Sequence, residues 1–158
     1  MKAIGKFQGE DLPKILRSSP YFRGVPGKLL EEMAPFFRET SFAKGAIILK
    51  ENSRARHLFI LSKGKVALST RRGAGELVTE IVKKKGNLFG WSALVPPRRY
   101  TSTAKALENS RVLSIAGKDM EGLLKRYPSF GLLFLQRLSS VIATRLYHTR
   151  SLLAETLA

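Results

Sequence analysis

The sequence contains no cysteine, so disulfide bonds, zinc–thiolate sites and cysteine nucleophiles are all excluded. Only two histidines are present, His57 and His148, and neither has neighbours typical of a metal site. Acidic residues are few and show no pairing typical of general acid–base catalysis. Neither a Gly-x-Ser-x-Gly elbow nor a Gly-rich loop followed by Lys-Ser/Thr is found. The sequence therefore predicts a protein that is not an enzyme and that holds no metal.

Long apolar runs are also missing. No stretch approaches the ~20 residues that a membrane-spanning helix requires. The first residues lack the apolar core of a secretory signal. We therefore expect no membrane partner and, by default, a cytoplasmic location.

Negative charge is scarce, because 28 lysines and arginines face only 12 acidic residues and give a net charge of +16. A surface of this sign attracts anions, whether nucleic acid, an acidic membrane or a phosphorylated ligand. The alternative is an ordinary solvated surface. The basic residues are spread along the chain, and no helix-turn-helix or zinc pattern directs them to DNA. We expect only weak or non-specific binding to nucleic acid.

The 158 residues, 44% of them hydrophobic, fit a single domain over residues 1–158. Residues 11–37 have helical periodicity, with Asp11 placed to cap the first helix. Residues 38–116 contain short β-branched and aromatic segments separated by glycines, which is typical of a sandwich or barrel. Residues 117–158 return to a helical period. Strands are expected at residues 46–49, 57–61, 65–70, 76–82, 101–106 and 111–115.

The C-terminal part is predicted to be a short helix over residues 118–127, stopped by Pro128, and a long helix that Ser129 caps. The predicted fold class is therefore α+β: N-terminal helices, an antiparallel β-roll of the jelly-roll type, a short helix and a long C-terminal helix. The apolar stripe of the long helix favours a homodimer formed through that helix. The stripe consists of Leu132, Leu135, Leu138, Ile142, Leu146 and Leu153.

Three motifs occur in a characteristic order: FAKGAII at residues 42–48, LFILSKGKV at 58–66, and GNLFGWSALVPPRRYTSTAKA at 86–106. In this order they resemble the cyclic-nucleotide-binding domain family of catabolite-activator-type regulators, kinase regulatory subunits and gated channels. The resemblance covers residues 12–153. It implies a non-catalytic regulatory module with a small anionic ligand such as cAMP or cGMP. The activators of the family carry a further helix-turn-helix domain, which is not expected in a chain that stops at Ala158.

The motif at residues 86–106 resembles the family's phosphate-binding cassette. Gly90 precedes a predicted short helix, so backbone N–H groups can approach a phosphate there. In the family a glutamate follows this glycine and an arginine ends the loop. Here Trp91 replaces the glutamate, and the best register places Tyr100 at the arginine position, whereas a shift of one residue places Arg99 there.

On the long helix, Arg145 and Thr149 match an arginine and a threonine that face the pocket in the activators. The two residues are one helical turn apart, so they lie on one face.

The alternative to a ligand-binding module is a degenerate, ligand-free domain that acts as a protein-interaction or dimerisation scaffold, with Trp91 filling the empty pocket. The candidate ligand-binding residues are Gly90, Trp91, Ser92, Ala93, Arg99, Tyr100, Thr101, Ser102, Arg145 and Thr149.

Overall fold

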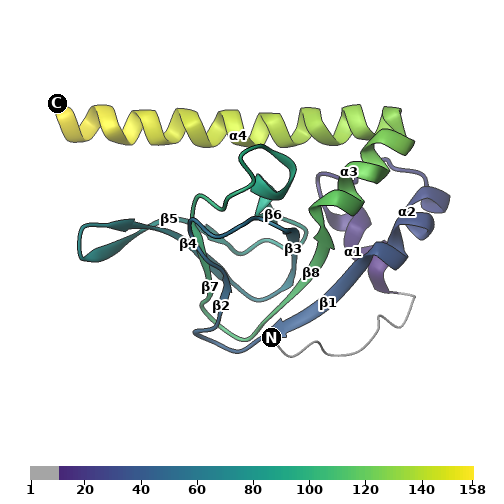
Figure 1. Cartoon of the computed structure of the whole chain (residues 1–158), viewed down its shortest axis with the longest axis horizontal. Coiled ribbons are helices and arrows are strands. Elements are labelled where there is room, and N and C mark those ends of the chain that lie inside the picture. Colours follow the sequence, from purple (N-terminus) through teal and green to yellow (C-terminus); the bar gives the residue numbers. More distant parts are fainter. Residues whose placement is uncertain (1–10) are drawn as a thin grey trace.

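The computed structural model describes residues 11–158 and confirms the α+β prediction (Figure 1). Helices α1 (Asp11–Ser18) and α2 (Gly27–Met33) come before the strands, and α3 (Gly117–Arg126) and α4 (Pro128–Leu157) follow them. The side chain of Asp11, the predicted cap, lies outside the described residues. The strands are β1 (Phe37–Phe42), β2 (Ile47–Leu49), β3 (His57–Lys63), β4 (Val66–Arg72), β5 (Gly75–Val82), β6 (Leu88–Phe89), β7 (Thr103–Ala106) and β8 (Ser110–Ala116).

The strands form two four-stranded antiparallel sheets, with the orders β1-β8-β3-β6 and β2-β7-β4-β5. Strand β3 is buried on both faces from Leu58 to Leu61, as its continuous apolar sequence indicates. The β3–β4 turn requires Gly64, whose φ of 107° favours glycine and whose Cβ would lie 2.7 Å from the backbone of Ser110. Together the two sheets form the predicted β-roll.

Strand β1 was not among the six predicted strands. The helical pattern continues to Phe37 in the sequence, but α2 ends at Met33 and a 3-10 turn with Pro35 leads into β1. The strand is polar in composition and pairs with β8 over six residues. Its buried positions, Phe37, Thr40 and Phe42, alternate only imperfectly with exposed ones, so periodicity alone did not identify it.

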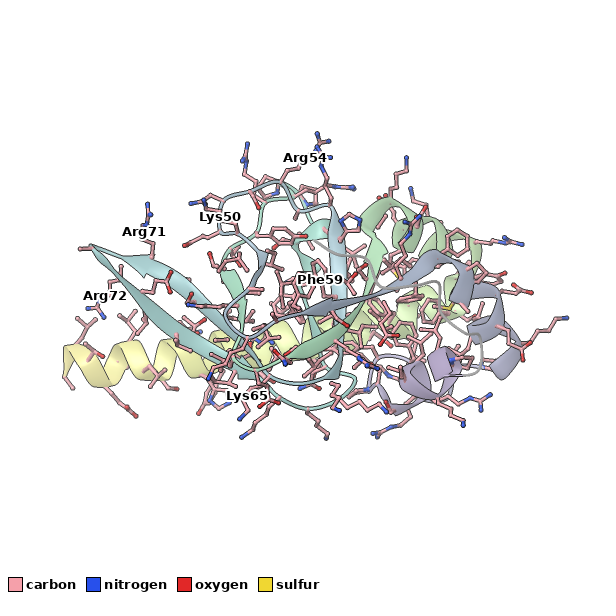
Figure 2. The ribbon with its side chains drawn as sticks, turned by 90° about the horizontal axis from the view of Figure 1, so that it is seen from below. Lys50, Arg54, Phe59, Lys65, Arg71 and Arg72 are labelled. Atoms are coloured by element: carbon pink, nitrogen blue, oxygen red, sulfur yellow. The ribbon has the colours of Figure 1, made fainter. Side chains whose placement is uncertain are left out.

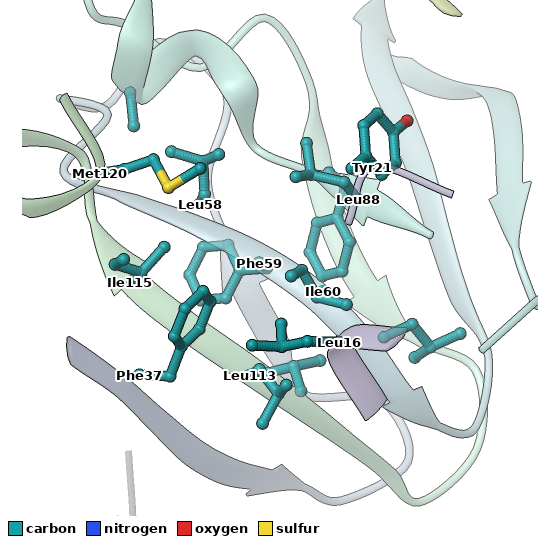
Figure 3. Packing of buried hydrophobic residues seen from close by; sticks show 14 of the residues in the cluster. Leu16, Tyr21, Phe37, Leu58, Phe59, Ile60, Leu88, Leu113, Ile115 and Met120 are labelled. Atoms are coloured by element: carbon teal, nitrogen blue, oxygen red, sulfur yellow. The ribbon is translucent and has the colours of Figure 1, made fainter. Parts of the chain in front are cut away.

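Side chains from both ends of the chain meet those of the roll in one hydrophobic cluster (Figure 3). Leu16 and Tyr21 from the N-terminal segment lie beside Ile60 and Leu88 of the roll, and Met120 of α3 packs close to Leu58. These apolar contacts fix the positions of the N-terminal helices and of α3 against the sheets.

Helix α4 begins at Pro128, so Ser129 lies inside the helix and the prediction that Ser129 is the cap was wrong. Proline is favoured in the first turn of a helix because its missing N–H is not needed there. The same proline does end α3, which stops at Arg126. Figure 1 shows α4 running along one side of the whole molecule and extending over the β4–β5 hairpin. None of the helices within residues 11–158 combines the length and the apolar character that a membrane span requires.

Helix α4 contacts the domain through Phe130, Phe134 and Leu138, spaced by four residues, and Phe130 stacks on Phe22 with ring centroids 5.7 Å apart. Leu138 is the one member of the predicted stripe that belongs to this core. The other five positions are exposed by 36% to 62%, because they lie on a different face of the helix. Within residues 11–158 of one copy, the stripe therefore remains uncovered; it consists of Leu132, Leu135, Ile142, Leu146 and Leu153.

Candidate functional site

A cleft of about 540 Å³ lies between the sheet β2-β7-β4-β5, the cassette and α4. It brings together eight of the ten residues that the sequence singled out, from segments more than 40 residues apart. Its other walls come from β2, β4, β5 and the C-terminal half of α4, including Leu68, Thr79 and Glu80. The eight predicted residues that line it are Gly90, Trp91, Ser92, Tyr100, Thr101, Ser102, Arg145 and Thr149.

Gly90 starts the cassette in a left-handed conformation, with φ of 76°, and a 3-10 helix from Trp91 to Leu94 follows. A Cβ atom at Gly90 would lie only 3.2 Å from the backbone oxygen of His57, so glycine is required both for the turn and for the close approach. Ala93 of the 3-10 helix is 1% exposed and lies against Gly117, and it does not line the cleft. Ala93 thus anchors the cassette in the core, and its assignment as a ligand-binding residue stays a prediction.

Tyr100 lines the cleft and is almost completely buried. Its hydroxyl donates a hydrogen bond to the backbone oxygen of His57 at 2.8 Å and accepts one from the backbone N–H of His57 at 3.2 Å. Burial raises the pKa of the Tyr100 phenol, so the side chain stays neutral. At the end of the loop, the cleft is therefore lined by a neutral side chain whose hydroxyl is already hydrogen-bonded to the backbone of His57.

Arg99 does not line the cleft in this structure, and its assignment as a ligand-binding residue stays a prediction. Its side chain is exposed, and one guanidinium N–H donates to the backbone oxygen of Asn52 at 2.8 Å. The neighbouring Arg98 pairs with Glu121 of α3 at 3.0 Å. Both loop arginines thus hold the loop to adjacent parts of the fold and leave no guanidinium from this loop in the cleft.

Arg145 connects three walls of the cleft. From α4 its guanidinium pairs with the Glu80 carboxylate of β5, at 2.5 Å from one oxygen. The guanidinium carbon also lies 4.1 Å from the ring centroid of Trp91, a cation–π contact. Partial burial lowers the pKa of Arg145, and Glu80 opposes this shift, so the group stays charged.

Glu80 was not predicted as a site residue, although a signal was available. A half-buried arginine on α4 requires a carboxylate partner, and the sequence offers few acids. The formal charges of the two residues cancel, and the remaining polar groups of the cleft are mostly hydroxyls, including those of Ser92, Thr101 and Ser102. The cleft therefore suits a ligand with one charge or none better than one with several charges.

Basic side chains point outward from several edges of the molecule. Figure 2 shows Arg71 and Arg72 near the tip of the β4–β5 hairpin, with Lys50, Arg54 and Lys65 on other edges. The described residues show no group of three or more histidines or acids that could hold a metal ion. The labelled basic residues lie on different edges, and weak and non-specific binding to nucleic acid stays a prediction.

The family model described as "Cyclic nucleotide-binding domain" matches residues 39–127, more than half of the chain. The chain therefore belongs to the cyclic nucleotide-binding domain family, as the sequence motifs predicted. The curated relatives reported below are regulatory proteins by their names.

Relatives within the family include the Cyclic AMP receptor protein of Thermus thermophilus, 24% identical over 83% of this chain and 59% of the relative. The Global nitrogen regulator of Synechocystis is 33% identical over 73% of this chain and 52% of the relative. The chain thus spans between half and three fifths of the length of these curated relatives. A putative cyclic nucleotide-binding protein from Geobacter metallireducens has a similar crystal structure, with a TM-score of 0.69, 30% identity, and coverage of 85% of this chain and 97% of that one.

Proposed function

We propose that the chain is a non-catalytic sensor module that binds a small ligand of the cyclic-nucleotide class, such as cAMP or cGMP, in the cleft beneath α4. The observation that carries this proposal is the position of Arg145, which contacts both the cassette and β5 from α4. A ligand that enters the cleft must share or replace these contacts. A cyclic nucleotide carries a single negative charge, which fits walls whose own charges cancel.

The cassette is non-standard, because Trp91 and Tyr100 stand where the family has glutamate and arginine. The indole of Trp91 offers a flat face for a base, and base–aromatic stacking is worth about 1–3 kcal/mol. The hydroxyls of Ser92 and Thr101, together with the backbone at Gly90, offer hydrogen bonds to the ribose and phosphate. Stacking and neutral hydrogen bonds would thus take over the roles of the missing charged groups.

Binding would be transmitted through Arg145. A base that stacks on Trp91 displaces the Arg145 guanidinium from the indole ring. The C-terminal half of α4 then loses one of the contacts that hold it against the roll. A ligand shifts such an equilibrium only by the difference in its affinity for the two arrangements. Helix α4 is therefore the output element of the proposed module.

Isothermal titration calorimetry with cAMP, cGMP, adenosine and guanosine tests the proposal. We expect saturable binding of at least one of these, weakened about tenfold or more in Thr101→Val and Ser92→Ala, because each variant loses a hydrogen bond to the charged ligand. Thr144→Val is the matched control, since Thr144 is an exposed residue of α4 outside the cleft whose hydroxyl donates to the backbone oxygen of Ser140. Absence of binding for all four compounds would refute the sensor function.

A second candidate function is a ligand-free scaffold that dimerises through α4. The exposed stripe favours it, because Leu132, Leu135, Ile142, Leu146 and Leu153 are separated by three, seven, four and seven residues and so fit one heptad register. Ser139 and Thr149 occupy the intervening positions of that register. A second copy of the same helix would cover this face. A dimer is also compatible with ligand binding.

Sedimentation equilibrium distinguishes the dimer from a monomer. Ile142→Arg combined with Leu146→Arg should convert the dimer to a monomer, because two charges would face the partner helix. Thr144→Arg, on an exposed position on the side of α4 opposite the heptad stripe, should leave the mass unchanged. A monomeric parent protein, or a double variant that remains dimeric, contradicts assembly through this stripe.

A further inference from the structure

A second cleft, of about 320 Å³, shares Glu80 and Arg145 with the cassette cleft and otherwise has different walls. One wall is the segment between α1 and α2, with Tyr21 and Arg23. Another is α4, with Arg137 and Ser140. The Arg145–Glu80 pair therefore borders two separate spaces, one on the cassette and one on the N-terminal segment.

The charges of the two clefts differ. The described residues that line the second cleft include three arginines, Arg23, Arg137 and Arg145, and a single acid, Glu80. Glu80 pairs with Arg145, and within residues 11–158 neither Arg23 nor Arg137 forms an ion pair. The second cleft thus has a formal excess of two positive charges, whereas the charges of the cassette cleft cancel.

Arg137 shows where an anion would sit. One terminal guanidinium nitrogen, Nη1, is shielded from solvent and has no hydrogen-bond partner among the described residues. A buried donor without an acceptor is unfavourable, most of all when it is charged. An anion in the cleft would supply that acceptor. Ser140, one helical turn from Arg137 on α4, brings a hydroxyl to the same cleft.

We propose that this second cleft binds the phosphoryl group of a small molecule, held by the guanidinium groups of Arg137 and Arg23. The planar fork of arginine matches two phosphate oxygens, and these charge-assisted hydrogen bonds are the strong ones. A doubly charged phosphomonoester or inorganic phosphate suits two unpaired guanidinium groups better than the singly charged phosphodiester of a cyclic nucleotide. The proposal concerns a different ligand from that of the cassette cleft, held by Arg137 and Arg23, which do not line the cassette cleft, and it stands independently of the sensor function.

Because Arg145 borders both clefts, an anion near Arg137 would attract its guanidinium and weaken the pair with Glu80. Trp91, the only tryptophan of the chain, lies against the same guanidinium. Its fluorescence therefore reports on the second cleft from a distance. If both sites are occupied, linkage requires that each ligand change the affinity of the other by the same factor.

Equilibrium dialysis with radiolabelled inorganic phosphate, at constant ionic strength, tests the proposal on the whole chain. A second arm uses ribose 5-phosphate as competitor and separates free phosphate from a phosphomonoester as the preferred source. We expect one saturable site, weakened about tenfold or more in Arg137→Gln and by a smaller factor in the rim variant Arg23→Gln. Arg137→Lys keeps the charge without the fork and should have an intermediate affinity.

Arg150→Gln is the matched control, because it removes the same charge from an exposed position on α4 outside the cleft. Its phosphate affinity should equal that of the parent protein. An equal loss in Arg150→Gln and Arg137→Gln would show that phosphate responds only to net charge and would overturn the site. Absence of saturable binding in the parent protein would overturn it as well. Circular dichroism of Arg137→Lys verifies that the fold is retained.

Discussion

Replacing Tyr100 by phenylalanine removes one oxygen atom from the wall of the cassette cleft and leaves the ring in place. That oxygen makes two hydrogen bonds, one to the backbone N–H and one to the backbone oxygen of His57. These bonds hold the end of the cassette loop to the first residue of β3. Tyr100→Phe therefore tests whether this residue has become a structural element of the pocket wall.

The expected loss follows from the burial of the site. Each net hydrogen bond contributes about 0.5–1.5 kcal/mol, and a buried group left without a partner adds to the cost. Tyr100 is 7% exposed, so water replaces these bonds poorly. We expect a loss of about 2 kcal/mol in the free energy of unfolding, which lowers the Tm of a chain of this length by about 4–8 °C.

Thermal unfolding followed by circular dichroism measures the effect. Tyr147→Phe is the control, because Tyr147 is 70% exposed on α4 and should unfold at the temperature of the parent protein. Equal Tm values for Tyr100→Phe and the parent protein would refute the structural role. Such a result would mean that the Tyr100 hydroxyl does not stabilise the fold and is available to bind a ligand.

Three further predictions concern the glycines of the scaffold, the titration of His57 and the basic surface. Gly64→Ala should lower the free energy of unfolding by more than about 2 kcal/mol, because the added Cβ would collide with Ser110. Gly122→Ala in α3 should raise it by about 0.5–1 kcal/mol, because a Cβ there meets nothing within 4 Å. Denaturant titrations in which both variants change the free energy of unfolding in the same direction would contradict this. Burial and the nearby Arg56 lower the pKa of His57 below 6.5, so the unfolded chain takes up the proton first and stability should fall as the pH drops below about 6.5. His57→Gln should remove this part of the pH dependence and His148→Gln should not, and an unchanged slope in His57→Gln would refute it. Retention on DNA should fall steeply between about 50 and 200 mM salt and should not depend on sequence, so salt-resistant retention would contradict a dispersed basic surface.

Much of the fold could be predicted from local patterns. The glycine-punctuated apolar segments identified strands β2, β3, β4, β5, β7 and β8 to within two residues at each end, whereas the two-residue strand β6 was missed. Strand β1 was missed because its stability comes from pairing with β8, about 70 residues away, and its polar sequence carries little local signal. The apolar stripe of α4 was partly misassigned because periodicity shows that a helix has an apolar face but does not show which of two faces packs on its own chain.

The candidate site was predicted in outline and not in its contacts. The cassette and Arg145 were identified because motif order carries over between family members. The pairing of Arg145 with Glu80 depends on how β5 passes beneath α4, and local sequence does not encode that geometry. The choice between Arg99 and Tyr100 was open for a similar reason: the buried bonds of Tyr100 to His57 form only when the loop closes on β3.

The central claim is that a ligand occupies the cassette cleft and takes the place of Arg145 on Trp91. The chain has one tryptophan, so its indole N–H gives a single, unambiguous signal in a ¹⁵N-labelled sample. Titration with cAMP or cGMP should shift this signal and that of the Gly90 amide together and to saturation, while the amide of exposed Arg150 remains unchanged. If saturating cyclic nucleotide leaves the indole signal of Trp91 where it was, the ligand does not bind in this cleft and the account is wrong.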